Sequence, residues 1–170
     1  IFAKTADGKD NQKFKNLVEQ MSESALNVYI SDDVDFRVWD KLIINANYNS
    51  LCAITGLTMG ELMDQQQGME LMEDVTKELV AVANAKGIGL EFEAGMEHIK
   101  DLGAKVRNHY PSLTQDVARK VPTEIDFING AIVREGKKNN IPTPVNETIV
   151  KLIKVIENTY EYGKEFSTTK

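Results

Sequence analysis

After position 33, apolar residues recur at three- and four-residue spacing over most of the chain, which predicts a helical domain. Breaks between the stripes fall at glycine and proline, where helices usually end. Thr58 and Glu61 have the spacing of a capping box, and Gly87 lies where a helix would end. The segments expected to be helical are residues 34–54, 69–86, 91–110, 112–120, 123–138 and 145–164. We expect a bundle of about six or seven helices.

The first 33 residues have a different pattern. Apolar residues alternate in Leu26–Ile30, which predicts a short strand, and helical spacing precedes it between positions 14 and 21. Residues 1–4 could supply a second strand. Because one helix and one short strand cannot make a stable sheet, the segment resembles the last βαβ step of a larger α/β domain. We therefore expect residues 1–33 to be the tail of one domain and residues 34–170 to form another.

Composition and charge exclude several classes of protein. Lys and Arg number 20 against 26 Asp and Glu, a net charge of −6, which argues against a nucleic-acid binder. No apolar stretch approaches the roughly 20 residues of a membrane helix, and the first residues lack the apolar core of a signal peptide. The chain begins with Ile1, and we expect a piece of a longer protein that works in the reducing cytoplasm.

Cysteine and histidine offer little chemistry in this sequence. Cys52, the one cysteine, lies in an apolar run, so it is expected in the core and excludes an internal disulfide. One cysteine and two histidines argue against a zinc site, and we expect no metal. His98 and His109 are both expected at the surface.

The segment around Trp39 carries an unusual set of polar residues. Lys41, Asn45 and Asn49 are spaced i, i+4 and i+8, so they share one helix face, apart from the apolar stripe. A cation and two amides in a row can hold an anion or a carbonyl group. Asparagine is a poor helix former, so its use here favours a functional role. A solvated polar face is the alternative.

Two further segments read, by themselves, as ordinary helix starts. Ser112 follows Pro111 in the manner of an N-cap, and Glu124 falls in the first turn of the helix predicted after Thr123. The pair Gly87 and Gly89 is not a dinucleotide fingerprint, because it follows a helix and lacks the third glycine.

Four blocks in order resemble the signature of the ketopantoate reductase family. They are Trp39–Asn45 with Asn49, Ser112–Asp116, Thr123–Gly130 and Ile141–Asn146. The resemblance covers about residues 34–160. It implies a mainly α fold, a helical bundle like the C-terminal domain of 6-phosphogluconate dehydrogenase, preceded by a remnant of an NADP-binding Rossmann α/β domain.

The resemblance also implies an activity and a site. Enzymes of this family reduce ketopantoate to pantoate with NADPH, for pantothenate and coenzyme A biosynthesis, as 2-dehydropantoate 2-reductases. By similarity, Lys41 is the catalytic proton donor, and Glu124 lies near the cofactor. The substrate-binding residues are Asn45, Asn49 and Ser112. The implied partners are a small 2-oxoacid and a second copy of the chain in a homodimer, with no nucleic acid and no membrane.

Two departures from the family pattern keep other interpretations open. Met59, before Gly60, stands where some relatives carry a substrate-binding asparagine, so another 2-oxoacid is an alternative substrate. No Gly-x-Gly-x-x-Gly motif is present, so the isolated chain is expected to be inactive. A β-hydroxyacid dehydrogenase also fits a Lys-x-x-x-Asn pair, but Asp35–Trp39 is not the glycine-rich run expected before its lysine. The remaining alternative is a stand-alone helical binding or dimerisation module.

Overall fold

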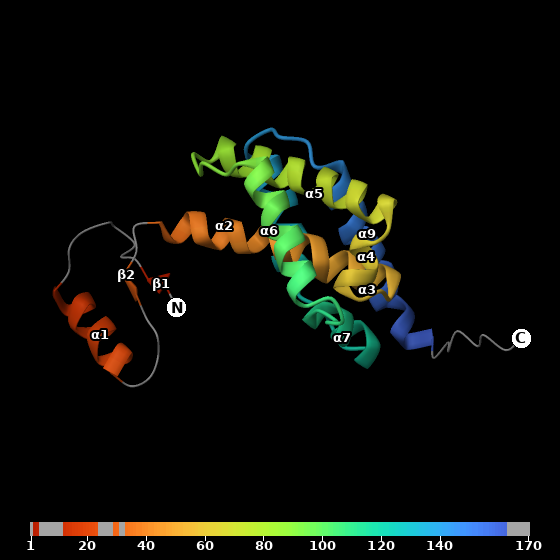
Figure 1. Ribbon diagram of the computed structural model, residues 1–170, viewed down its shortest axis with the longest axis horizontal. Coiled ribbons are helices and arrows are strands. Elements are labelled where there is room, and N and C mark those ends of the chain that lie inside the picture. The colour runs from red at the N-terminus through yellow and green to blue at the C-terminus, as the bar shows by residue number, and fades with distance from the viewer. Residues whose placement is uncertain (1, 4–11, 24–28, 31–32, 163–170) are drawn as a thin grey trace, which may run out of the picture. The chain divides into compact units, whose positions relative to one another are not determined.

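The computed structural model describes residues 2–3, 12–23, 29–30 and 33–162 (Figure 1). The chain divides into two compact units, Ile1–Val38 and Trp39–Lys170. This division falls inside helix α2 (Val34–Ile44). The domain boundary expected after residue 33 stays a prediction.

The first unit holds a single βαβ step. Strands β1 (Phe2–Ala3) and β2 (Tyr29–Ile30) pair in parallel, and helix α1 (Gln12–Glu23) connects them. Phe2 lies opposite Tyr29, and Ala3 opposite Ile30. A parallel pair needs such a crossover, so the βαβ reading of this segment is confirmed for its described residues. Residues 1, 4 and 26–28, also expected in strands, lie outside them.

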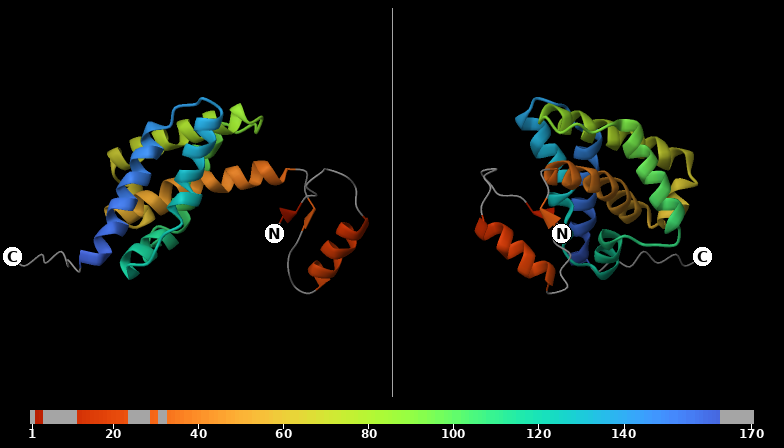
Figure 2. Two further views of the ribbon diagram at one scale, coloured as in Figure 1. Left: turned by 180° about the vertical axis from the view of Figure 1, so that it is seen from behind. Right: turned by 60° about the vertical axis from the view of Figure 1, so that its left-hand side comes forward.

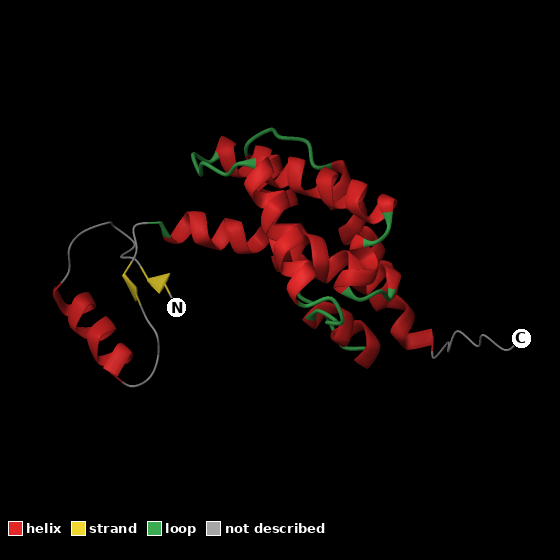
Figure 3. Cartoon of the chain, viewed as in Figure 1, coloured by secondary structure: helices red, strands yellow, loops and turns green. Residues whose placement is uncertain are grey.

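The second unit is helical, and the two short strands of the first unit are the only ones in the described residues (Figure 3). Helix α2 continues without interruption through a π-helix, η1 (Asn45–Asn49), into α3 (Ser50–Thr55). The remaining helices are α4 (Met59–Met63), α5 (Gln66–Ala85), α6 (Phe92–Lys105), α7 (Ser112–Arg119), α8 (Asn129–Lys138) and α9 (Pro144–Thr159), with 3₁₀ turns η2 (Ile125–Phe127) and η3 (Tyr160–Tyr162). With α2–η1–α3 as one run, the described part of the chain has seven α-helical runs after Asp33, as predicted.

The core of this unit forms where the helices turn their apolar stripes toward one another. Helix α3 packs against α4, α7 and α9, and α5 lies beside α9 (Figure 2). Cys52 on α3 is fully buried, as predicted. Leu152 fits the apolar stripe that predicts a helix over residues 145–164 and is expected to face inward, but it is 44% exposed because Ile149 and Ile153 face inward on α9. The fully buried residues of α5, α6 and α8 include Met72, Val75, Leu79, Val82, Ile99 and Ile132.

The largest differences from the predicted helix bounds occur at two helices. Helix α6 stops at Lys105 and not near Tyr110, because the next residues bond to the start of α4: Gly60 N donates to Arg107 O at 2.8 Å. The helix expected over residues 123–138 is broken at Ile128, whose φ of −102° and ψ of −100° are not helical. The segment after the first break, with Val106 and His109, lines the pocket described below.

None of the helices in the described part of the chain combines the length and the apolar character that a membrane span requires.

Candidate active site

An open pocket of about 550 Å³ in the helical unit brings together all five residues predicted to form a site. Lys41, Asn45 and Asn49 come from α2 and η1, Ser112 begins α7, and Glu124 precedes η2. Residues that are far apart in the sequence therefore meet at one place. The other residues that line the pocket are Ile44, Tyr48, Met59, Leu102, Val106, His109 and Pro111.

The π-helix aligns the polar row along the pocket. In an α-helix the direction of a side chain drifts by about 40° over each four-residue step, which would put Asn49 about 80° from Lys41. A π-turn has about 4.4 residues per turn, since its hydrogen bonds run from i to i+5. Over four residues the side-chain direction therefore falls about 30° short of a full turn. Asn49 therefore returns to within roughly 10° of the direction of Lys41, and all three side chains can reach one ligand.

Buried side chains satisfy the backbone that this π-turn leaves open. Ser50 N bonds to Asn47 O, so the Ala46 carbonyl loses its usual partner four residues on. That carbonyl instead accepts from the Ser50 hydroxyl at 2.6 Å and from Asn129 Nδ2 at 3.0 Å. The neighbouring Asn47 side chain bonds to the preceding turn and to α5: its Nδ2 donates to Ile43 O at 2.8 Å and to Thr76 Oγ1 at 3.0 Å. The turn is thus held from behind, away from the pocket.

The support extends to two further helices. Asn129 Nδ2 also donates to Asn146 Oδ1 at 2.9 Å, and Asn146 Nδ2 donates to Glu78 Oε2 at 2.7 Å. The Glu78 carboxylate accepts the backbone N–H groups of Val145 and Asn146 as well, so it caps the start of α9. A chain of buried and half-buried polar groups therefore links α5, α8 and α9 to the π-turn.

Lys41 and Tyr48 both carry a group that can donate a proton, and their surroundings in the pocket differ. Lys41 is exposed at the pocket and carries an ammonium group. Tyr48 is fully buried, and its hydroxyl donates to Ile99 O at 2.8 Å. Burial, with a smaller effect of Cys52, raises the pKa of the Tyr48 phenol above its usual value. Tyr48 is thus a packing residue, whereas Lys41 presents an exposed cation to the pocket.

Ser112 has another role than the one its local sequence suggests. The predicted N-cap is wrong: Pro111 occupies that position, and the Ser112 side chain makes no capping bond. Its hydroxyl instead lies 3.5 Å from Nδ2 of Asn49 on the π-helix. This distance is at the long limit of a hydrogen bond, so both groups can turn toward a ligand.

Glu124 reaches the pocket because the residue before it is anchored. The backbone N–H and the hydroxyl of Thr123 both donate to Glu157 Oε1 on α9, each at 2.7 Å. These bonds fix the loop before Glu124, and the helical backbone begins only at Ile125. The Glu124 carboxylate is exposed at the pocket and can accept hydrogen bonds.

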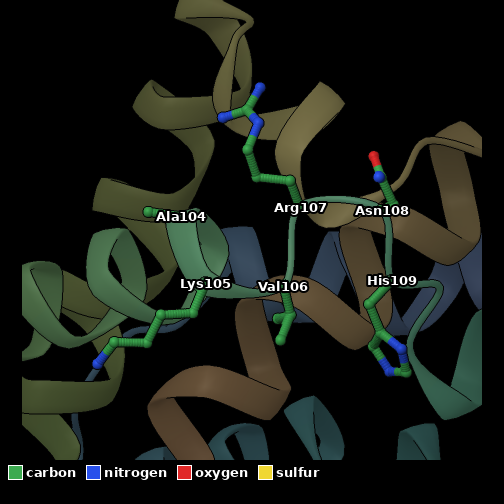
Figure 4. A pocket seen from close by; sticks show the side chains of 6 residues that line it. All are labelled: Ala104, Lys105, Val106, Arg107, Asn108 and His109. Atoms are coloured by element: carbon green, nitrogen blue, oxygen red, sulfur yellow. The ribbon is translucent and has the colours of Figure 1, made fainter.

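The segment that follows α6 forms a second wall of the pocket, and sequence reasoning missed it. Val106 and His109 point to one side of this segment, whereas Arg107 and Asn108 point to the other (Figure 4). On the outer side, Arg107 pairs with Asp64 at 2.6 Å. Val106 fits the apolar stripe that predicts a helix over residues 91–110, which would place it in the core, but it is 38% exposed, and both Val106 and His109 line the pocket. His109 is at the surface as predicted, but it borders the site.

Comparison with known proteins identifies the family. The family model described as ketopantoate reductase PanE/ApbA C terminal matches residues 33–157. The chain belongs to the ketopantoate reductase family. A 2-dehydropantoate 2-reductase from Streptococcus pyogenes serotype M3 is 32% identical over 148 residues, which are 86% of this chain and 48% of that relative. The chain thus spans about half the length of the curated relatives that it matches.

Solved structures of ketopantoate reductases and of another enzyme share this fold. A PanE/ApbA family ketopantoate reductase from Ralstonia eutropha JMP134 aligns with a TM-score of 0.81 at 34% identity, over 93% of this chain and 51% of that one. A D-mandelate dehydrogenase, solved with NADH and anilino(oxo)acetate, aligns with a TM-score of 0.80 at 31% identity, over 88% of this chain and 62% of that one. The mainly helical fold expected for the family is confirmed.

The family signature in this chain thus combines two kinds of residue. Lys41, Asn45 and Ser112 line the pocket, whereas Asn129 and Asn146, at the ends of two signature blocks, lie behind it and are fully buried. In this ketopantoate reductase domain, the third block contributes Glu124 to the pocket and Asn129 to the support of the π-turn, whereas the last block contributes Asn146 to that support.

Proposed function

We propose that this chain is the substrate-side part of a nicotinamide-dependent reductase that converts a 2-oxoacid into a 2-hydroxyacid. The observation that supports it is the single pocket that joins the Lys41 ammonium to the amides of Asn45 and Asn49. The names of the relatives make ketopantoate the first candidate substrate and NADPH the first candidate reductant. The product would then be pantoate, for pantothenate and coenzyme A biosynthesis in the cytoplasm, and a homodimer is the assembly proposed with it.

The residues of the pocket suit this reaction. The keto oxygen becomes negative when its carbon accepts a hydride, and an ammonium beside it stabilises that charge. Lys41 then gives its proton to the oxygen, which becomes the hydroxyl of the product, so Lys41 acts as the general acid. The amides of Asn45 and Asn49 and the Ser112 hydroxyl can donate hydrogen bonds to the substrate carboxylate.

The pocket fits one end of the cofactor. When bound, the nicotinamide supplies the hydride. The Glu124 carboxylate can accept hydrogen bonds from an amide or a ribose hydroxyl at the pocket edge. Pyrophosphate binding normally uses a glycine-rich loop and a helix N-terminus, and no Gly-x-Gly-x-x-Gly motif occurs in this sequence. We therefore expect the chain alone to bind NADPH weakly and to turn over none.

A second candidate is reduction of another 2-oxoacid by the same chemistry. It is favoured by the apolar residues of the pocket, Met59, Leu102 and Val106 among them. It also agrees with the similarity to a D-mandelate dehydrogenase that was solved with an aromatic oxoacid.

The test is a product analysis on the full-length protein with NADPH or NADH and ketopantoate. The proposal predicts that oxidised nucleotide and 2-hydroxyacid form in equal amounts. If no 2-oxoacid is consumed with either nucleotide, and size-exclusion chromatography shows the protein bound to a partner, the chain is a helical binding or dimerisation module instead.

A further inference from the structure

We infer that the pocket selects 2-oxoacids whose side chain is hydrocarbon, and that Met59 determines this selection. The inference rests on the proposed function and narrows its substrate class. It follows from the way in which polar and apolar residues are separated in the pocket.

The two flanks of the π-helix differ in chemistry. On one flank, Asn49 contacts Ser112 at the start of α7. On the other flank, Tyr48 reaches α6 through its hydrogen bond to Ile99 O. Ile44 lies one turn before Tyr48 on that same flank. The row of Lys41, Asn45 and Asn49 therefore has a polar neighbour on one side and an apolar helix on the other.

The apolar flank is completed by residues from α6 and α4. Leu102 lies on α6 one turn after Ile99, Val106 directly follows the end of α6, and Met59 begins α4. A substrate whose carboxylate and keto oxygen are held by the polar row thus directs its third substituent, the side chain, toward these residues. The hydrocarbon wall consists of Ile44, Met59, Leu102 and Val106.

Met59 is held firmly in this wall. The Thr58 and Glu61 capping box, predicted from the sequence, is present: Thr58 N donates to Glu61 Oε2 at 2.8 Å, and Glu61 N donates to Thr58 Oγ1 at 3.3 Å. Met59 N donates to His109 O at 3.2 Å. A Cβ on Gly60 would lie 2.7 Å from Arg107 Cβ, so the two segments are in close contact. With 3% of its surface exposed, Met59 is packed on nearly all sides.

The wall offers little to a substrate hydroxyl. The Tyr48 hydroxyl already donates to Ile99 O. His109 is exposed, so water solvates its ring at the pocket mouth. A hydroxyl placed against Met59 would lose water without gaining a partner, and an apolar pocket discriminates against an added hydroxyl by about 10- to 100-fold.

A matched pair of substrates tests this directly. Ketopantoate and 3,3-dimethyl-2-oxobutanoate differ only by the terminal hydroxyl. In the full-length protein, kcat/KM should be about 10- to 100-fold higher for 3,3-dimethyl-2-oxobutanoate. Equal values, or a preference for ketopantoate, would overturn the inference and leave the proposed function intact. Reduction of neither compound, nor of any other 2-oxoacid, would overturn both.

Two variants of Met59 assign the selection to this residue. Met59→Asn should lower the ratio of the two kcat/KM values by about tenfold, because the amide can bond to the hydroxyl, whereas Met59→Leu should leave the ratio within about twofold. Both kcat/KM values are measured on the same preparation of each variant, so a lower fraction of folded protein reduces them equally and leaves their ratio unchanged. If Met59→Asn does not fold, Val106→Thr, at a partly exposed position, should lower the ratio about threefold. An unchanged ratio in the folded polar variant would contradict the assignment.

Discussion

Replacing Asn129 by leucine should both destabilise the chain and weaken substrate binding. Asn129 is fully buried, and its Nδ2 donates to Ala46 O and to Asn146 Oδ1. Ala46 O keeps the Ser50 hydroxyl as a donor, so its loss is about 1 kcal/mol. Asn146 Oδ1 would be left buried without a donor, which costs about 1–3 kcal/mol. Leucine also removes Asn129 Oδ1, a buried acceptor without a donor, so we expect the free energy of unfolding to fall by about 1–3 kcal/mol.

Urea unfolding of the chain measures the first effect, and the KM for the 2-oxoacid in the full-length protein measures the second. KM should rise because the π-turn that aligns Asn45 and Asn49 loses a support. Asn139→Ala is the control: Asn139 Nδ2 also donates to a backbone carbonyl from α8, at 2.8 Å to Glu135 O, but it is half-buried and far from the turn. Asn139→Ala should lower the free energy of unfolding by about 1 kcal/mol or less and leave KM unchanged. A cost below about 0.5 kcal/mol for Asn129→Leu, with unchanged KM, would refute the reasoning.

Three further predictions concern single groups. Asn45→Ala or Asn49→Ala should raise KM for the 2-oxoacid about tenfold with little change in NADPH affinity, and the reverse pattern would count against their assignment. Hydrogen bonds from Lys138 and Lys86 lower the pKa of Glu135 to about 2, below its unfolded value, so its contribution is present above about pH 4.5 and is lost as the pH falls toward 2. Urea midpoints should therefore show Glu135→Gln less stable than the wild type at pH 7, with the gap closing in acid. A gap independent of pH would contradict this. Burial, with Glu61 second, raises the pKa of Cys52 to about 12. Thiol labelling at pH 8 should require unfolding by urea, and rapid labelling of the native chain would show that Cys52 is accessible.

The sequence could predict most of the helices because their apolar stripes are long and regular. The stripe of Met72, Val75 and Leu79 marks the face of α5 that the structure buries. The polar row of Lys41, Asn45 and Asn49 could be found in the same way, because its members lie one turn apart. Signals of this kind are local, and a single sequence displays them directly.

The π-turn and the second wall of the pocket could not be found in this way. Asn45–Asn49 adopts a π-helix because Asn129, more than 80 residues further on, supplies a donor to Ala46 O. The helix ends before Val106 because Gly60 N donates to Arg107 O. The apolar side chain of Val106 therefore predicts a place in the core, whereas the residue lines the pocket. Contacts between segments far apart in the sequence determine the π-turn and the second wall, and helical periodicity contains no information about such contacts.

The proposed reaction depends most on Lys41, the group that protonates the substrate. In the full-length protein, Lys41→Ala should lower kcat for the 2-oxoacid by about 10²- to 10⁴-fold, as expected for a lost general acid. The control is Lys77→Ala, since Lys77 is an exposed lysine of α5 that pairs with Asp74 and does not line the pocket. Its kcat should equal that of the wild type. A Lys41→Ala enzyme that keeps a near wild-type kcat would contradict the assignment of this pocket as the site of reduction.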